Sequence, residues 1–158
     1  MTTDDGSITV RPIGRVVGGR HEAVDDRWDA ETCTIELDPD RLEAGATDGL
    51  ADFSHVEVVF CFDRVDEDTV CRGTRRPRGR TDWPSVGILA QRAKDRPNRI
   101  GVTTCRLVAV RPFALEVTGL DAVDGTPVLD VKPYLAEFGP RGGVRQPAWS
   151  TELMAGYW

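Results

Sequence analysis

The sequence predicts a mainly β fold, a single-domain closed or half-open antiparallel β-barrel with a few short helices. Apolar and polar residues alternate in short runs rich in β-branched residues, and 26 glycines and prolines punctuate the spaces between these runs. Helical signals are few. Because a sheet of this size must protect its edges, closure into a barrel is favoured. With 158 residues, about the length of one domain, we treat residues 1–158 as a single unit.

Each expected strand is a short run in which apolar residues recur at every second position. The run HVEVVFCF is too apolar to expose either face, so it is expected at the centre of the sheet. The first expected strand takes in Ile8, Val10, Pro12 and residues 14–17. The others are, in order, 33–37, 55–62, 86–90, 100–110, 115–117 and 128–131.

Two short helices are expected. Asp38 opens DPDRLEAG as an acidic cap, Pro39 suits the first turn and Gly45 suits the end, which predicts a helical turn or two. Near the end of the chain, Ser150 is expected to cap STELMAGYW, with Glu152 in its first turn.

The net charge of −6 conceals a strongly basic stretch. Between Arg72 and Arg111 there are eleven Lys and Arg against two acids, a local balance of +9 that leaves −15 for the rest. This stretch includes the expected loop 72–84, RGTRRPRGRTDWP, where Trp83 adds an aromatic surface. Such a loop suits an anionic ligand or a nucleic-acid backbone. Alternatively, its arginines form salt bridges with the acidic part of the chain or of a second subunit.

Other classes of protein are disfavoured. No apolar run approaches the roughly 20 residues of a membrane helix, and MTTDDGSITVRPIG lacks the features of a signal peptide, so a cytoplasmic location is expected. Phosphate-binding glycine motifs and hydrolase motifs do not occur. The cysteines lack metal-binding spacing, so we expect no metal site and interpret them as reduced core residues: Cys33, Cys61, Cys71 and Cys105.

The segment QRAKDRPNRIG, residues 91–101, concentrates charge beside an expected strand. If residues 91–96 form a helical turn, Arg92 and Arg96 share one face, which suits a carboxylate or phosphate. Pro97 restricts Arg96, and Asn98 can present its amide or adopt a left-handed turn.

The segment GLDAVDGTPVLDVKPYL, residues 119–135, contains an Asp-Gly turn followed by Thr-Pro. This arrangement is expected to hold the carboxylates of Asp121 and Asp124 close together, where they could accept hydrogen bonds from ribose hydroxyls or from a substrate N–H. A tight hairpin stapled by Asp side chains is the alternative.

Three blocks of sequence resemble the TrmO family of S-adenosylmethionine-dependent methyltransferases. They are GLADFSHVEVVFCFDRV, RRPRGRTDWPSVGILAQRAKDRPNRIG and LEVTGLDAVDGTPVLDVKPYL, the last similar to the family signature LD-x-x-DGTP-x-x-D-x-KPY. The similarity spans about residues 10–138 and leaves 139–158 as a C-terminal extension.

The resemblance implies a homodimeric barrel that binds S-adenosyl-L-methionine near the subunit interface and methylates N6 of threonylcarbamoyladenosine beside the tRNA anticodon. The implied cofactor-binding residues are Asp63, Arg64, Arg92, Arg96, Pro97, Asn98, Leu120, Asp121, Ala122, Val123, Asp124, Lys132, Pro133 and Tyr134. The implied RNA-binding residues are Arg72, Arg75, Arg76 and Arg78. Asp121 or Asp124 is the candidate catalytic base.

Some positions depart from the family pattern. Gln91 and Arg99 replace a Thr and a Pro common in the family, and Asp63 and Arg64 replace His-Gln. We also expect the protein to lack the extra C-terminal domain of longer bacterial members. These departures leave other functions open: a methyltransferase acting on a small metabolite, a non-catalytic cofactor-binding module, or a structural barrel dimer.

Overall fold

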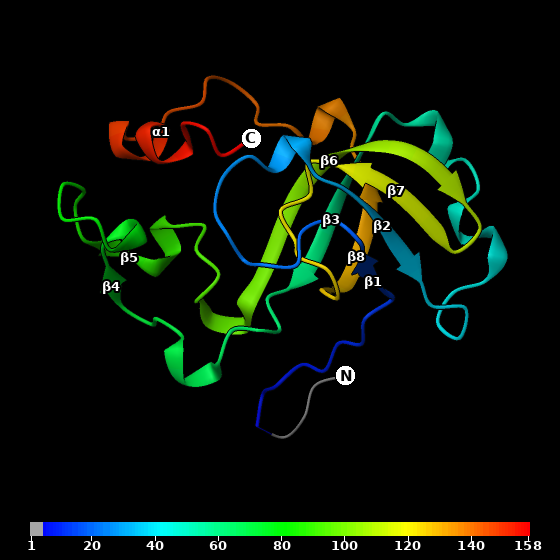
Figure 1. Ribbon diagram of the computed structural model, residues 1–158, viewed down its shortest axis with the longest axis horizontal. Helices are drawn as coiled ribbons and strands as arrows, with labels where there is room; N and C mark the ends of the chain where they lie inside the picture. Colours follow the sequence, from blue (N-terminus) through cyan, green and yellow to red (C-terminus); the bar gives the residue numbers. More distant parts are fainter. Residues whose placement is uncertain (1–4) are drawn as a thin grey trace.

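A computed structural model describes residues 5–158, so residues 1–4, part of the predicted single unit, lie outside it. Six strands form a closed antiparallel barrel in the order β1-β2-β7-β6-β3-β8, and β4 and β5 form a separate pair (Figure 1). This confirms the predicted fold class. The elements are β1 (Gly14–Val17), β2 (Thr32–Leu37), β3 (His55–Cys61), β4 (Thr74–Arg75), β5 (Val86–Gly87), β6 (Ile100–Arg111), β7 (Ala114–Thr118), β8 (Pro127–Pro133) and the helix α1 (Ala148–Met154).

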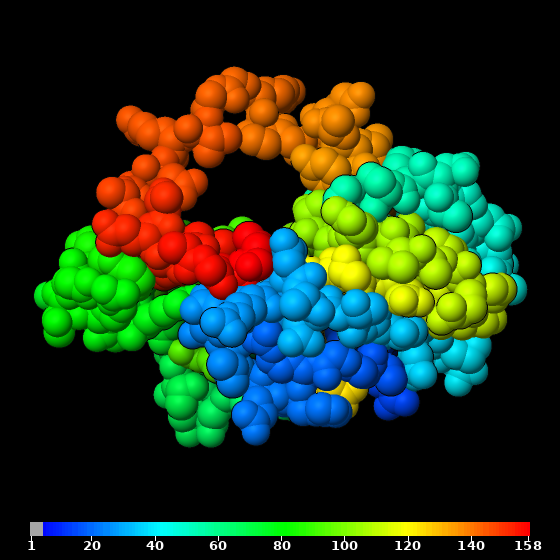
Figure 2. All heavy atoms as spheres, turned by 45° about the horizontal axis from the view of Figure 1, so that its top comes forward, coloured from blue at the N-terminus to red at the C-terminus, as the bar shows by residue number. Residues whose placement is uncertain are grey.

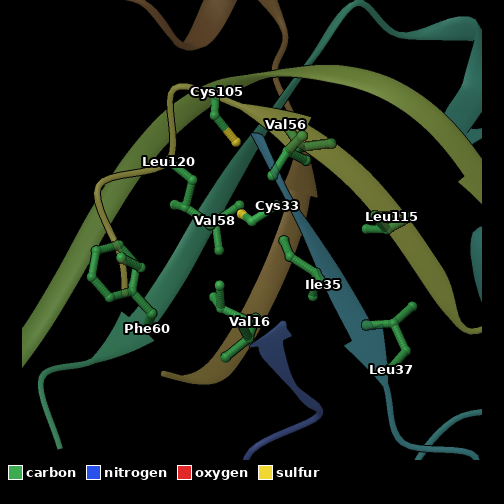
Figure 3. Close-up of a cluster of buried hydrophobic side chains, with 13 residues drawn as sticks. Val16, Cys33, Ile35, Leu37, Val56, Val58, Phe60, Cys105, Leu115 and Leu120 are labelled. Carbon is green, nitrogen blue, oxygen red and sulfur yellow. The ribbon is translucent and has the colours of Figure 1, made fainter. Parts of the chain in front are cut away.

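The barrel interior is filled by every second residue of its strands. In β3, Val56, Val58 and Phe60 are buried while the residues between them are half-buried, so this strand is covered on both faces, as predicted. Figure 3 shows Val58 and Phe60 among inward side chains from the other strands, with Cys33 and Cys105 among them. These two thiols are core residues, as predicted.

The strand β6 pairs differently along its two halves. From Ile100 to Cys105 its residues pair with β3, and only from Arg106 onward do they pair with β7. The loop between β7 and β8 (residues 119–126) contacts the first half of β6 through Asp121 and Thr103. The loop therefore lies where the ladder between β6 and β7 has ended.

Some short elements differ from the prediction. The expected strand 86–90 is the two-residue β5 followed by a 3-10 helix, Ile88–Ala90. The expected loop 72–84 contains β4, which pairs with β5. The buried amide of Gln91 supports this pair, because it donates to a backbone carbonyl of each strand, those of Arg75 and Val86. The run from Ile8 to Pro12 is not a strand.

The two predicted helices need correction. Asp38 accepts from the backbone N–H of Asp40 at 2.8 Å, but this opens a turn, and the following 3-10 helix, Ala44–Thr47, includes the glycine expected to end it. In α1 the N-cap is Pro147, and Ser150 lies inside the helix, where its hydroxyl donates to the carbonyl of Pro147 at 2.7 Å. A serine in the first turn can use this nearby acceptor instead of capping.

Two segments stand outside the barrel. The side lobe (residues 66–99) carries β4 and β5, and the C-terminal strap (residues 139–158) carries α1 (Figure 1). In Figure 2 the first part of the strap, in orange, stands off from the body and leaves an opening beneath it. The strap returns to the lobe where the indole N–H of Trp83 donates to Glu152 at 2.8 Å. No helix in residues 5–158 is long and apolar enough to cross a membrane.

Candidate functional site

The first half of β6 is where the two charged segments meet. Thr103 is buried and its hydroxyl donates to Asp121, while Arg92 donates to the carbonyl of Val102 at 2.6 Å. One segment supplies the carboxylate and the other supplies the guanidinium, at adjacent positions of one strand. The structure thus brings Arg92 and Asp121 to the same part of the barrel.

The loop between β7 and β8 turns alternate residues in opposite directions. Leu120 and Ala122 are buried in the core, whereas Asp121 and Val123 are only partly buried. Gly119 begins the loop with a φ of 77°, a left-handed conformation that suits glycine. Because the side chains of Leu120 and Ala122 fill the core, these residues can offer a ligand only their backbone groups.

Asp124 serves the fold of this loop directly. Its carboxylate accepts from the backbone N–H of Gly18 at 2.8 Å and lies 3.4 Å from the imidazole Nδ1 of His21. Arg64 donates to the carbonyls of His21 and Asp124, both at 2.7 Å. Asp124 therefore staples the turn, as the hairpin alternative proposed, and its carboxylate faces different partners from that of Asp121.

Residues 91–96 do not form the expected helical turn. Arg96 is extended, with φ of −118° and ψ of 158°, because a residue before proline avoids the helical region. It donates to the carbonyl of Gln91 at 2.6 Å, so the predicted helical pairing of Arg92 with Arg96 is wrong.

The residues after Arg96 lead into β6 and are bonded to the residues that follow β3. Pro97 begins a 3-10 turn, and Asn98 has a φ of 65°, the left-handed conformation that was one of its two expected roles. The backbone carbonyl of Arg99 accepts from the N–H of Phe62 at 2.8 Å. The guanidinium of Arg99 donates to the carbonyl of Val65 at 2.7 Å. This ties the segment to exposed Asp63 and Arg64.

The arginines assigned to RNA all have partners within the chain. Arg75 lies 2.6 Å from Asp95, and Arg76 donates to the carbonyl of Thr81 at 3.2 Å and to that of Trp83. The remaining two pair with acids at longer range or across the lobe boundary: Arg72 with Glu67 at 3.5 Å, and Arg78 with Asp25 at 3.7 Å and Asp26 at 2.8 Å. The salt-bridged alternative therefore describes this loop, although Arg72 remains largely exposed.

Lys132 and Tyr134 lie at the other end of β8. Lys132 is opposite Glu57 in the ladder with β3, and the N–H of Tyr134 bonds to the carbonyl of His55. Asp63 and Arg64, by contrast, follow the far end of β3. An ion pair of 2.8 Å with Asp130 raises the pKa of Lys132. Lys132, Pro133 and Tyr134 are therefore not brought beside Asp121 within one chain.

The expected site residues thus fall into two groups, one around Asp121 and Asp124 and the other at Lys132, Pro133 and Tyr134. A surface hollow lies near each group. One, of about 680 Å³, lies in the connection between β1 and β2 beside the partners of Asp124, and it is lined by Arg20, His21, Glu22, Val24, Asp25, Asp26 and Arg27. The other, of about 400 Å³, includes Asp130 and Pro133 and is mostly apolar. Each hollow adjoins one of the two groups of expected site residues.

Sequence reasoning missed Thr103 and Tyr157, which both donate to the carboxylate of Asp121. Thr103 carries a detectable signal, because it is a polar residue between Gly101 and Cys105 in the inward-facing register of β6. Tyr157 carries none, since it comes from the C-terminal strap and its position depends on the path of the whole segment.

The clustering of metal-ligating residues and the state of the two core thiols can both be described. Within residues 5–158 no group of three or more His, Cys, Asp or Glu could hold a metal ion. Burial raises the pKa of Cys33 to about 11 and that of Cys105 to about 12, so both remain neutral thiols.

Comparison with known proteins identifies the relatives of this arrangement. The family described as tRNA-methyltransferase O N-terminal domain matches residues 25–139. The crystal structure of TrmO from Pseudomonas aeruginosa superposes with a TM-score of 0.72 at 30% identity, covering 90% of this chain and 62% of that one.

Two curated relatives differ in length. The human tRNA (adenine(37)-N6)-methyltransferase is 37% identical over 99 residues, which are 63% of this chain and 22% of the human protein. A protein of Methanothermobacter thermautotrophicus, assigned as S-adenosyl-L-methionine-binding, is 34% identical over 146 residues, 87% of this chain and 98% of the relative. The chain thus spans about a fifth of the human relative and nearly all of the archaeal one.

Proposed function

This chain belongs to the TrmO family, whose N-terminal domain matches residues 25–139, and we propose that it is an S-adenosyl-L-methionine-dependent methyltransferase. The observation that carries the proposal is the meeting of Asp121 with Arg92 on the first half of β6. It lies within the matched region and joins the two segments that carry the family resemblance.

The residues of this region fit the chemistry of the cofactor. S-adenosyl-L-methionine has a carboxylate, an amine and a ribose diol, which need a cationic group and hydrogen-bond acceptors. Arg92 is exposed and cationic, and Asp121 and Asp124 offer carboxylate oxygens. Backbone groups of the loop 119–126 complete the set, since Leu120 and Ala122 lie along it. The bound cofactor supplies a methyl group already activated on sulfonium.

Asp121 is the better candidate for the catalytic base. Asp124 already holds the N–H of Gly18 and borders His21, contacts that shape the loop. Among residues 5–158, the donors to the Asp121 carboxylate are the hydroxyls of Thr103 and Tyr157, one on each oxygen, and each oxygen retains acceptor capacity. Methyl transfer to nitrogen releases a proton, which Asp121 would accept while the neighbouring residues hold the acceptor in line.

The acceptor we propose is N6 of threonylcarbamoyladenosine in tRNA, next to the anticodon. The name of the human relative, which methylates adenine 37 at N6, supports the position and the atom. Exposed Arg72 at the edge of the side lobe is suited to a phosphate backbone.

A small metabolite is the second candidate acceptor. Arg75 and Arg78 are each paired with acids of the same chain, which reduces the cationic surface left for RNA. A buried small acceptor would need no such surface, so these ion pairs favour the alternative.

We also propose a cytoplasmic homodimer. Lys132 and Tyr134 lie at the opposite end of β8 from the region of Asp121, so one chain does not unite the residues that the family resemblance assigns to the cofactor. In a dimer with a twofold axis, Lys132 and Tyr134 of one chain could lie beside the Asp121 region of the other chain. Light scattering checks this assembly, and a monomer at micromolar concentration would contradict it.

The deciding experiment is mass spectrometry of tRNA nucleosides from a deletion strain. Loss of N6-methylated threonylcarbamoyladenosine, restored by the wild-type gene but not by Asp121→Asn, is expected. Persistence of that nucleoside removes the tRNA assignment. Transfer from labelled cofactor into tRNA or into a small-molecule extract then separates the two acceptors.

Salt dependence provides a second discrimination. An RNA acceptor held by several arginines loses affinity steeply with rising salt, whereas a small buried acceptor does not. Cofactor binding without transfer to either acceptor pool would indicate a binding module.

A further inference from the structure

The C-terminal strap places a phenol against the carboxylate of Asp121. The hydroxyl of Tyr157 donates to one oxygen of Asp121, and that of Thr103 donates to the other. Tyr157 is 36 residues from Asp121 along the chain, and it is only partly exposed. Two hydroxyls from separate elements therefore grip opposite oxygens of a single side chain.

The position of Tyr157 is fixed by its own backbone and by the rest of the strap. Its carbonyl accepts from the N–H of Trp28 at 2.9 Å, and the carbonyl of Gly156 accepts from Arg27 at 2.9 Å. One helical turn earlier, Glu152 accepts from the indole N–H of Trp83. The strap is thus anchored to the connection between β1 and β2 at Gly156 and Tyr157, and to the side lobe at Glu152.

The phenol stays a donor across the physiological range. Burial raises the pKa of Tyr157 most, and the negative charge of Asp121 raises it further, while the cation of Arg92 acts in the opposite direction. A group with a raised pKa keeps its proton as the pH rises, so the hydroxyl remains available to Asp121.

We infer that Tyr157 is a positioning residue for methyl transfer, holding the Asp121 carboxylate, together with Thr103, in the orientation that meets the acceptor N–H. The inference rests on the proposed function. Because each carboxylate oxygen accepts one hydroxyl, the carboxylate cannot rotate freely. Each oxygen still has a lone pair that can accept a further hydrogen bond. A small misplacement of a catalytic group costs rate far more than binding.

The first test is Tyr157→Phe, which removes the hydroxyl and keeps the ring. The single-turnover rate at saturating cofactor is expected to fall about tenfold, less than the roughly hundredfold loss that a full 1 Å displacement can cause. The Kd of S-adenosylhomocysteine, measured by calorimetry, is expected to change less than about twofold, since the interaction lost acts on the transition state. Thr103→Val, which removes the other donor at constant shape, is expected to act in the same direction.

The control is Gln146→Ala, on the same strap. Gln146 contacts Ser150 and Thr151 and has no contact with Asp121, so its rate is expected to match the wild type. Thermal unfolding of each variant verifies that the protein remains folded.

A double-mutant cycle separates positioning from a general structural role. In an Asp121→Asn background, Tyr157→Phe is expected to lower the residual rate far less than it does in the wild type, because the residue that it positions has already been changed. A full tenfold loss in that background, or a wild-type rate for Tyr157→Phe alone, overturns the inference and leaves the proposed function standing. Absence of transfer by the wild type to every acceptor overturns both.

Discussion

Arg78 in the side lobe and Asp26 in the connection between β1 and β2 form a two-contact ion pair, with nitrogen-oxygen distances of 2.8 and 3.3 Å. Both residues have left-handed backbones, with φ of 52° and 75°. The pair joins a segment assigned to RNA with the wall of the larger hollow. It is one of the places where the basic stretch 72–111 forms ion pairs with acids from the rest of the chain.

Substitution of Asp26 by Asn is expected to loosen this junction. Arg78 lowers the pKa of Asp26 below its ordinary value of 3.8, so the contribution of the pair is present above that value and is lost as the pH falls through the lower, folded value. The side chain is partly exposed, so the loss at pH 7 should stay below about 1 kcal/mol. Urea denaturation at pH 7 and near pH 3 measures it, and a larger loss at the lower pH would contradict the assignment.

Replacing Gly101 by Ala is expected to destabilise the barrel by about 1–3 kcal/mol, the usual cost of overpacking a core. A Cβ there would lie 2.5 Å from the ring of Phe60 and 2.9 Å from that of Phe62. Gly87→Ala is the matched control, since Gly87 also lies in a strand, has a φ of −60° and has open space around it. Equal midpoints for the two variants in chemical denaturation would refute the packing argument.

Gln91→Ala is expected to release the β4-β5 pair from its support. The buried amide of Gln91 donates to the carbonyls of Arg75 and Val86, each at 3.0 Å. Leaving such acceptors unpaired costs about 1–3 kcal/mol. Hydrogen exchange should increase in residues 74–75 and 86–87 while the protection of β3 is retained, and unchanged exchange in the pair would argue against this role.

Stability is expected to decline above pH 9 because of the two core cysteines. Their ordinary pKa is 9.0, and burial raises it to about 11 for Cys33 and about 12 for Cys105. The unfolded thiols therefore lose protons that the folded ones keep, and each group removes up to about 1.4 kcal/mol per pH unit between these values. Cys105→Ala should flatten this slope while adding a packing loss that is independent of pH. Parallel slopes for variant and wild type would disprove the assignment.

The barrel strands could be predicted because their alternating residues face one core. The run HVEVVFCF became β3, which pairs with both β6 and β8, and the left-handed turn at Asn98 followed from the tolerance of asparagine for that region. The helical pairing of Arg92 and Arg96 failed because the proline restriction on Arg96 outweighed the charge pattern.

The environment of Asp121 could be predicted only in part. Its meeting with Arg92 was expected from the family resemblance, but its two hydroxyl partners depend on tertiary paths. Thr103 reaches it because the ladder between β6 and β7 begins only at Arg106, and Tyr157 reaches it through a strap without regular structure over much of its length. The inward register of β6 marks Thr103 as an unusual polar position, but no local pattern indicates that its partner is Asp121 or that Tyr157 reaches the same carboxylate.

Closure of the barrel has a consequence for how the chain folds. The neighbouring strands β6 and β7 are joined by a tight turn, so their pairing needs little loop closure. The final seam pairs Gly14 with Val128, near opposite ends of the barrel sequence, and must wait until most of the intervening chain is ordered. We therefore expect slow, cooperative folding, in which β1 is the last strand to be captured.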